Sequence, residues 1–277
     1  MRYSIFDPTG NITALVESPV AAELRPVTAA ELMRRHPEVE QVGFVGPAPA
    51  EDGAEAALCM AGGEFCGNAS MSAAALFLLR RGCERAEPET VKLRVSGAAA
   101  PVEVTLRRLA ADSFETSVRM PAALGIEERE FALGERRGTL PLVRMQGISH
   151  LVVEPGSVFF PMRDQRAAAE MAVRDWCREL GAEGLGLMFL ERGFETRLTP
   201  LVYVPGSGTV FWENSCASGT SAVGMALAEE RGACVELTLR EPGGTLRVVS
   251  FPGGATRLYG QVRFVGAYRE EPGHVLE

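Results

Sequence analysis

The 277-residue sequence lacks the features of several common functional classes. No stretch approaches the roughly 18–20 consecutive apolar residues that cross a bilayer, so a membrane role is not expected. Asp and Glu total 36 against 28 Lys and Arg, and the net charge of −8 argues against nucleic-acid binding. The first residues, MRYSIFDPTGN, do not contain the apolar run of a secretory signal, which predicts a cytoplasmic protein.

Metal ligands are scarce as well, because the chain has only three histidines. No two cysteines are spaced as Cys-x-x-Cys and no two histidines as His-x-x-x-His, so a closed metal site is not expected. A chain of this size in a reducing compartment does not need disulfides, and free thiols are expected. A cysteine with a special role should therefore act as a nucleophile or a base. The candidates are Cys59, Cys66, Cys83, Cys177, Cys216 and Cys234.

Apolar runs and turn residues predict an α+β protein with two similar halves, separated by turn residues after position 120. In the first half we expect a β-hairpin at 3–18, helices at 28–35 and 67–80, and strands at 39–45, 91–95, 102–107 and 114–120. In the second half we expect helices at 164–180 and 217–230, and strands at 139–145, 151–154, 185–190, 200–204, 210–212, 235–239, 245–250 and 261–265.

One motif occurs in both halves. Glu64-Phe-Cys-Gly-Asn-Ala-Ser in the first half corresponds to Glu213-Asn-Ser-Cys-Ala-Ser-Gly-Thr-Ser in the second. In each copy the cysteine directly precedes a predicted helix of small residues, and a strand pair with a glycine turn follows that helix. Such a repeat predicts duplicated domains related by a pseudo-twofold axis. Opposed copies would bring Cys66 and Cys216 face to face.

Two opposed thiols suit the inversion of an amino-acid stereocentre, which needs a base on one face of Cα and an acid on the other. A helix N-terminus stabilises a thiolate, so we expect it to lower the pKa of each thiol and to allow a thiol/thiolate pair near neutral pH. The first backbone N–H groups of both helices should bind the substrate carboxylate. These groups belong to Gly67, Asn68, Ala217 and Ser218.

The alternative for any cysteine in a helix of small residues is that it is only a small buried hydrophobic residue. We interpret four of the six cysteines in this way, namely Cys59, Cys83, Cys177 and Cys234. For Cys66 and Cys216 the repeated context favours proton transfer instead, and these two are the predicted catalytic residues.

The motifs carry a family resemblance. Cys66-Gly-Asn-Ala and Cys216-Ala-Ser-Gly-Thr resemble the paired Cys-Gly-Asn-Gly and Ala-Cys-Gly-Thr-Gly signatures of the diaminopimelate epimerase-like superfamily. Within it, the chain is most similar to the histidine racemases of staphylopine-type metallophore biosynthesis. Four strings carry this likeness: Met60-Ala-Gly-Gly-Glu-Phe-Cys-Gly-Asn, Glu40-Gln-Val-Gly-Phe, Trp212-Glu-Asn-Ser-Cys and Pro242-Gly-Gly. The order of elements matches over nearly the whole chain.

The resemblance implies two pseudo-symmetric domains, each a β-barrel-like sheet around a central helix, with the active site in the cleft between them. The first domain would comprise residues 1–121 and 262–277 and carry Cys66, and the second would comprise residues 122–261 and carry Cys216. The family uses no cofactor, neither PLP nor metal. The expected partner is a small amino acid, and the resemblance allows a homodimer, although no sequence feature identifies an interface.

The resemblance also suggests residues that contact the substrate. Asn11 corresponds to an early Gly-Asn whose side chain lies at the substrate, and the alternative is a turn residue. Glu40 could pair with the substrate's amino group or imidazole, and the alternative is an exposed surface residue. Glu213 could bind the substrate ammonium or cap backbone amides, and its charge, like that of Glu64, would raise the pKa of a nearby thiol. His150 either contacts the substrate or packs in the core.

The sequence differs from those of the diaminopimelate epimerases in two stretches that bear on which substrate is bound. Their Asn-Ala-Asp-Gly and Glu-Arg stretches are replaced by Cys59-Met-Ala-Gly and Tyr203-Val-Pro-Gly, so the clamp for a distal amino-acid group is missing. We therefore predict a racemase that converts L-histidine to D-histidine, for an opine-type metallophore, by two-base thiol/thiolate proton transfer. A diaminopimelate epimerase, a broad-specificity amino-acid racemase and a non-catalytic amino-acid-binding protein remain alternatives.

Overall fold

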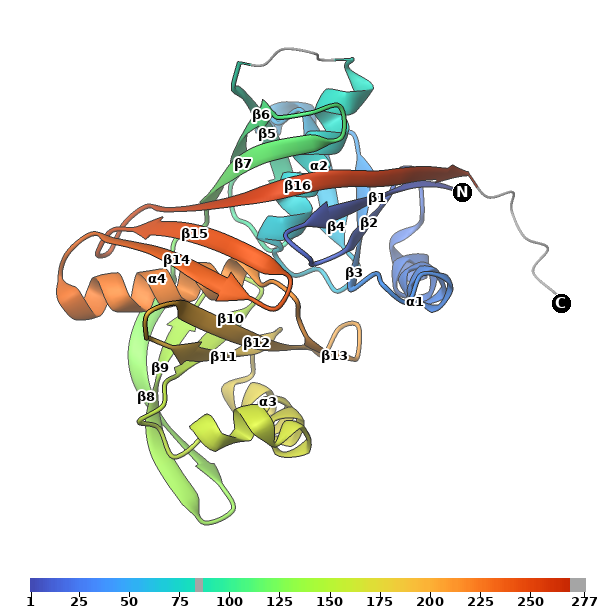
Figure 1. Ribbon diagram of the computed structural model, residues 1–277. Helices are drawn as coiled ribbons and strands as arrows, with labels where there is room; N and C mark the ends of the chain where they lie inside the picture. The colour runs from blue at the N-terminus through green and yellow to red at the C-terminus, as the bar shows by residue number, and fades with distance from the viewer. Residues whose placement is uncertain (83–86, 270–277) are drawn as a thin grey trace, which may run out of the picture.

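The computed structural model describes residues 1–82 and 87–269, which form an α+β protein, as predicted (Figure 1). Cys83 and the C-terminal residues 270–277, which the resemblance assigns to the first domain, lie outside the described residues. Within the described ranges, no helix is both long and apolar enough to cross a membrane.

The first half of the chain forms a closed barrel. Seven strands follow one another around it in sequence order, and the long strand β16 (Thr256–Arg269) pairs with β7 on one side and with β1 on the other, which closes a ring of eight strands. The seven strands are β1 (Arg2–Pro8), β2 (Thr13–Val16), β3 (Gln41–Gly46), β4 (Ala56–Met60), β5 (Glu89–Val95), β6 (Val102–Arg108) and β7 (Ser113–Met120).

The barrel encloses α2 (Gly67–Arg80), and α1 (Arg25–Arg35) packs outside, against β1 to β3. Small side chains let the strands approach α2 closely, and 11 of its 14 residues are buried. Its buried hydroxyls are satisfied within the helix: Ser70 Oγ donates to the Cys66 carbonyl at 2.7 Å, and Ser72 Oγ to the Asn68 carbonyl at 3.0 Å. Small polar side chains can therefore fill the barrel here, because the hydroxyls of Ser70 and Ser72 are both paired.

The second half forms an open sheet that continues from β16, in the order β16-β15-β14-β12-β11-β10-β9-β8, with β13 paired to β12. Helix α4 packs on one face of this sheet, in the same hydrophobic cluster as α2, and α3 packs on the other face. The elements are β8 (Gly125–Leu133), β9 (Arg136–Arg144), β10 (Ser149–Val153), α3 (Arg166–Leu180), β11 (Leu185–Glu191), β12 (Thr196–Val204), β13 (Thr209–Trp212), α4 (Ala217–Arg231), β14 (Val235–Glu241) and β15 (Gly244–Ser250).

Only the first of the two expected barrels is closed. Among the described strands no pairing joins β8 back to β16. The β8–β9 hairpin instead extends past α3, at the bottom of Figure 1. Its first strand is absent from our sequence prediction, because residues 127–130 read Glu-Glu-Arg-Glu and do not show the alternation of a half-buried strand. By contrast, the predicted helices at 67–80 and 217–230 are confirmed almost to the residue.

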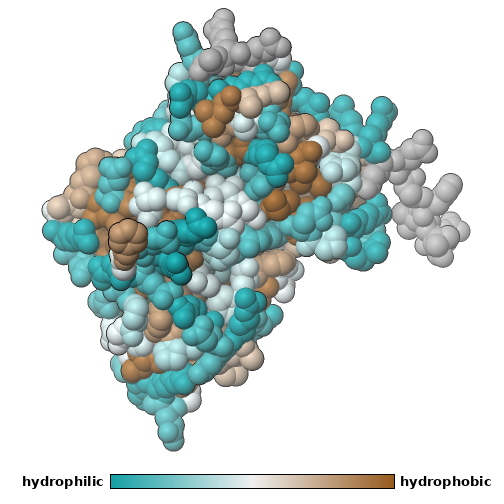
Figure 2. All heavy atoms as spheres, viewed as in Figure 1, coloured by the Kyte–Doolittle hydropathy of each residue, from teal (hydrophilic) through white to brown (hydrophobic). Residues whose placement is uncertain are grey.

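The hydrophobic core has three parts: a large cluster around α2 and α4 that joins the two halves, a cluster under α3, and a cluster under α1. On the face shown in Figure 2, hydrophobic residues form small separate patches among hydrophilic ones. The shared cluster matters most for function, because it holds the N-terminal ends of α2 and α4 in the interior.

Candidate active site

The two predicted cysteines begin α2 and α4 in the same way. Cys66 and Cys216 both have an extended backbone, with φ of −133° and −126°. Each Sγ accepts a hydrogen bond from the N–H three residues later, from Ala69 at 3.3 Å and from Gly219 at 3.4 Å. A side chain that accepts this N–H caps the helix, so the position of each sulfur is fixed by the start of its helix. The prediction that each cysteine begins a helix is confirmed.

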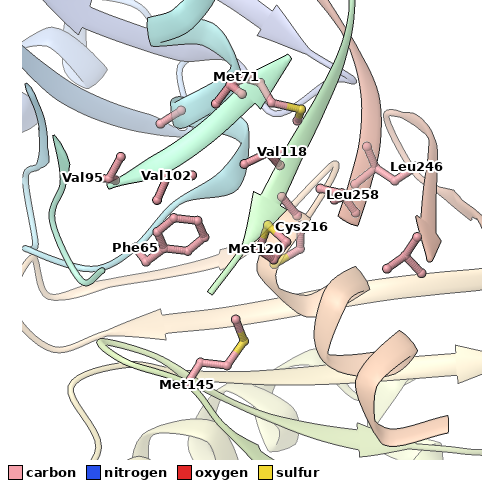
Figure 3. Close-up of a cluster of buried hydrophobic side chains, with 14 of the residues drawn as sticks. Phe65, Met71, Val95, Val102, Val118, Met120, Met145, Cys216, Leu246 and Leu258 are labelled. Carbon is pink, nitrogen blue, oxygen red and sulfur yellow. The ribbon is translucent and has the colours of Figure 1, made fainter. Parts of the chain in front are cut away.

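The starts of α2 and α4 lie against each other. A Cβ added to Gly67 would lie 2.8 Å from the Ala217 Cβ and 3.3 Å from Met120 Sδ, which leaves no room for a side chain at position 67. Figure 3 shows Cys216 beside Met120, at the end of β7. Gly67 and Ala217 directly follow the two cysteines, so the helix starts that Cys66 and Cys216 cap lie together where the two halves join.

Cys66 is half-buried, and its Sγ donates a hydrogen bond to Gln41 Oε1 at 3.0 Å. Burial raises the pKa of the Cys66 thiol to about 12, and the charges of Glu213 and Glu64 act in the same direction. The Ala69 N–H favours the thiolate but does not outweigh burial. The helix N-terminus thus acts in the expected direction, but our expectation of a net lowering of this pKa is wrong, whereas the expected effect of the two carboxylates is confirmed.

Cys216 is only 4% exposed. Its backbone N–H donates to Glu241 Oε2 at 2.6 Å, and Ser218 Oγ lies 3.7 Å from its sulfur. Burial raises the pKa of the Cys216 thiol well above its ordinary value, and Glu213, which is hydrogen-bonded to the thiol, raises it further. The charge of Glu241 acts in the same direction. The Gly219 N–H lowers the pKa as expected, but the expected net lowering is wrong for this thiol as well.

Two more predicted residues, Asn11 and Glu40, join a network between the halves. Asn11 Nδ2 donates to Glu40 Oε2 at 2.5 Å, and Asn11 Oδ1 accepts from Asn68 Nδ2 at 3.1 Å. Asn68 Nδ2 also donates to the Ser215 carbonyl at 3.0 Å, and Glu40 accepts from the Asn214 N–H at 3.3 Å. The network therefore ties predicted residues of the first half to the loop before Cys216.

A close backbone contact keeps Asn11 at this junction. The preceding residue, Gly10, has φ of +90°, and a Cβ there would lie only 2.5 Å from the Gly243 Cα in the β14–β15 turn. The Gly243 N–H in turn donates to the Asn214 carbonyl at 2.7 Å. Glycine at positions 10 and 243 thus lets the turn before Asn11 meet the second half.

Several buried carboxyl groups surround the cysteines. Burial raises the pKa of Glu213 and of Glu241 to about 8 in each case, and it also raises the pKa of Glu40 and Glu64. Glu241 additionally accepts a hydrogen bond from the Thr220 hydroxyl. Within the described residues, no three His, Cys, Asp or Glu side chains are arranged to hold a metal ion. The site can thus hold or release protons at several carboxyls around two thiols.

A cavity of about 70 Å³ adjoins this site. It lies between α1, the start of β3, the loop before α2 and the β12–β13 hairpin. Three polar residues that line it are Glu40, Gln41 and Glu64, while Pro26, Ala29, Ala30 and Met33 form an apolar wall. The cavity therefore combines an apolar wall with carboxylates, next to Cys66.

The remaining titratable residues of the sequence analysis lie elsewhere. His150, in β10, is fully buried, and neither ring nitrogen has a hydrogen-bond partner within the described residues, which agrees with the core alternative. Burial lowers the pKa of His150 to about 3. Cys177 is buried as predicted and Cys59 is half-buried, but the prediction is wrong for Cys234, which is exposed.

Two residues of the site are missing from our sequence prediction. Gln41 follows Glu40 directly and begins β3, so its place in the motif Glu40-Gln-Val-Gly-Phe was a usable signal. Glu241 had no such signal, because it ends β14 and reaches Cys216 only through the fold.

Comparisons with known proteins show that the chain is similar to histidine racemases. The model of the histidine racemase CntK N-terminal domain matches residues 1–261. A histidine racemase of Staphylococcus aureus is 30% identical over 271 residues, covering 96% of this chain and 95% of the relative. A histidine racemase of Fusobacterium nucleatum is 32% identical over 231 residues, covering 80% of this chain and 79% of the relative.

Solved structures show the same fold. The probable proline racemase of Agrobacterium radiobacter superposes with a TM-score of 0.68 at 16% identity, over 98% of this chain and 92% of that one. The family match over residues 1–261 includes both helices that begin with a cysteine. The chain belongs to the histidine racemase CntK N-terminal domain family.

Proposed function

We propose that the protein is a cofactor-independent histidine racemase in which Cys66 and Cys216 exchange a proton with the substrate Cα. The observation that carries this proposal is the contact between the starts of α2 and α4, where a Cβ on Gly67 would touch Ala217. Two helices that begin with a cysteine and meet at their first residues give one site with two thiols.

In the proposed reaction one cysteine, as thiolate, removes the Cα proton, and the other, as thiol, donates its proton to the opposite face. The substrate is thereby inverted, the first cysteine becomes a thiol and the second a thiolate. The backbone N–H groups that receive the substrate carboxylate belong to the first turns of α2 and α4, where helix geometry leaves them without intrahelical partners. These are the amides of Gly67, Asn68, Ala217 and Ser218.

The remaining contacts follow from charge. Glu213 is proposed to bind the substrate ammonium, and this ion pair would cancel the charge that raises the pKa of Cys216. A thiolate would then form mainly when substrate is bound. The side chain of the substrate is proposed to enter the cavity beside Cys66, where Glu40 can accept a hydrogen bond from an imidazole N–H. Asn11 orients Glu40.

Histidine is proposed as the substrate because the family model and both bacterial relatives bear that name. The apolar wall and paired carboxylates of the cavity are compatible with an imidazole. The product, D-histidine, is proposed to enter the synthesis of an opine-type metallophore.

The same proposal covers organisation and location. We propose two pseudo-symmetric domains, residues 1–121 with 262–277 and residues 122–261. The matching helix starts support this division, as does β16, whose last part pairs with β1. A cytoplasmic location would keep both thiols reduced, as the reaction requires. The assembly is proposed to be a homodimer, which sedimentation or light scattering of the purified protein would test.

The test of the function is deuterium exchange. Purified, reduced protein is incubated in deuterated water with each L-amino acid and with LL-diaminopimelate, and Cα deuteration is measured by mass spectrometry together with the D/L ratio. The proposal expects deuterated D-histidine. Exchange of diaminopimelate alone would identify an epimerase instead, and no exchange with any substrate would favour an amino-acid-binding protein.

A further inference from the structure

Gln41 contacts the sulfur of Cys66, and its side-chain amide can act in two opposite ways. With Oε1 toward the sulfur it accepts the S–H and favours the thiol, whereas with Nε2 toward the sulfur it would donate to a thiolate and favour ionisation. In the structure Cys66 Sγ donates to Oε1 at 3.0 Å. The effect of Gln41 on Cys66 thus depends on what fixes the orientation of the amide.

Both hydrogens of Gln41 Nε2 are used on the side away from Cys66. One is donated to Asn11 Oδ1 at 2.6 Å and the other to Thr13 Oγ1 at 2.7 Å. Thr13 acts as an acceptor here, because its own hydroxyl hydrogen is donated to the Asn11 carbonyl at 2.9 Å. Rotating the amide by 180° would therefore place Oε1 against Asn11 Oδ1, which can only accept, and break both hydrogen bonds of Nε2.

The orientation of Asn11 is fixed in turn from two sides. Its Nδ2 donates to the carboxylate of Glu40. Its Oδ1 accepts from Asn68 Nδ2, whose own orientation follows from a hydrogen bond to the Ser215 carbonyl, a group that can only accept. The second anchor does not depend on the protonation state of Glu40. The Asn11 amide consequently has one satisfied orientation, and the Asn68 amide has one in which both hydrogens of Nδ2 are donated.

We propose that Gln41 is a positioning residue of the active site, whose amide, locked through Asn11 by Glu40 and Asn68, keeps Oε1 toward the Cys66 sulfur as an acceptor and so favours the thiol in the resting protein. Burial is the largest cause that disfavours the Cys66 thiolate, and the lock adds to it, so release of the lock or entry of a cation would ease ionisation. The proposal deepens the racemase function, on which the catalytic role of Cys66 rests. Other charged groups that act on Cys66 are the carboxyls of Glu64 and Glu213.

The test measures the alkylation of Cys66 by iodoacetamide as a function of pH, read by peptide mass spectrometry in the full-length, substrate-free protein. Only thiolate reacts, so the rate reports the thiolate fraction. Gln41→Met keeps the length of the side chain but removes the strong acceptor, and we expect Cys66 to react about three- to tenfold faster at a given pH, the effect of one neutral hydrogen bond. Gln41→Glu keeps an acceptor toward the sulfur, so its rate should equal or fall below that of the unaltered protein.

Two other cysteines serve as controls in the same experiment. Exposed Cys234 should react equally in all variants, and buried Cys177 should stay protected as long as the fold is intact. If Gln41→Met leaves the Cys66 profile unchanged, or if both variants accelerate Cys66, the lock does not exist. Because alkylation needs no substrate, this result is independent of the deuterium-exchange test of racemase activity.

Discussion

Cys66 and Cys216 begin their helices alike but lie in different surroundings. Cys66 belongs to the closed barrel, is half-buried, and donates to the neutral amide of Gln41. Cys216 lies beside the open sheet, is almost fully buried, and is flanked by the carboxyls of Glu213 and Glu241. The geometry of the two helix starts is repeated, whereas the charge around them is not.

This difference shows that the two thiols are not interchangeable in the resting protein. At Cys216 burial opposes ionisation most, and the carboxyls of Glu213 and Glu241 add to it when they are ionised; a bound ammonium can offset their charge. At Cys66 the contacting side chain is a neutral amide, which acts through the direction of a hydrogen bond. Burial and the charge of Glu213 act on both thiols, but the other neighbours differ, so Gln41 variants should alter Cys66 and Glu241 variants should alter Cys216.

The largest expected effect comes from removing either thiol. Cys66→Ser and Cys216→Ser should each lower racemisation of histidine by about 10²- to 10⁴-fold, the usual contribution of one acid or base, because a hydroxyl does not ionise in this range. The assay is the D/L ratio of histidine over time. Equal losses would show that both positions take part in proton transfer despite their different surroundings.

The matched control is Cys234→Ser, the same substitution at an exposed cysteine in the loop after α4. It should retain full activity. Substantial racemisation by either Cys66→Ser or Cys216→Ser would contradict the two-base reaction and leave the surviving cysteine as the sole base.

A smaller effect is expected from Gly67→Ala, which tests the contact between the two helix starts. The added methyl group would overlap the Ala217 Cβ and push the thiols apart, and a displacement of this kind costs about 10- to 100-fold in kcat/KM. Stability should change less, since alanine also favours the helix by about 0.5–1 kcal/mol.

A second substitution makes this test specific. Ala217→Gly alone removes a methyl group and should keep most of the activity. Combined with Gly67→Ala it moves the methyl group from one helix start to the other, so the double variant should regain much of the lost kcat/KM. A double variant as impaired as Gly67→Ala would mean that the contact seen here does not limit catalysis.

The lesson for sequence reasoning is clearest at these same helix starts. The cysteines and the residues after them were predictable, because a capping position and a run of small residues are local properties of the chain. The direction of the thiol pKa shifts was not, because burial and the approach of Glu241 depend on β14 meeting α4. The local sequence pattern was enough to locate the two thiols, whereas tertiary packing determines their pKa values.

The open second sheet makes the same point for the fold. The family resemblance implied two alike barrels, yet closure of the first depends on β16 pairing with β1, from Arg2↔Arg269 to Pro8↔Val262. A contact between the two ends of the chain leaves no local pattern in either strand. The internal repeat could therefore predict the order of elements and the central helices, but not which sheet closes.

The carboxyls beside Cys216 should make stability depend on pH. The pKa of Glu241 is about 8 in the folded protein and 4.5 in its ordinary range, so the stability it contributes is fully present below about pH 4.5 and is lost as pH rises through 8. The urea midpoint should fall over this interval. In Glu241→Gln, which stays neutral, the fall should be smaller; an unchanged slope would mean that Glu241 ionises normally.

The smallest effects should separate two equivalent positions, the second residue after each cysteine. Asn68 donates to Asn11 and to the Ser215 carbonyl, so Asn68→Ala leaves buried acceptors unpaired and should cost about 1–3 kcal/mol of unfolding free energy. Ser218 Oγ lies 3.7 Å from Cys216 Sγ, and Ser218→Ala should cost below about 1 kcal/mol. Urea denaturation measures both. Equal costs would mean that the hydrogen bonds from Asn68 to Asn11 and to the Ser215 carbonyl do not stabilise the contact between the halves. A larger cost at Asn68 would show that they do, and Asn68 is also the residue that orients the amides beside Cys66.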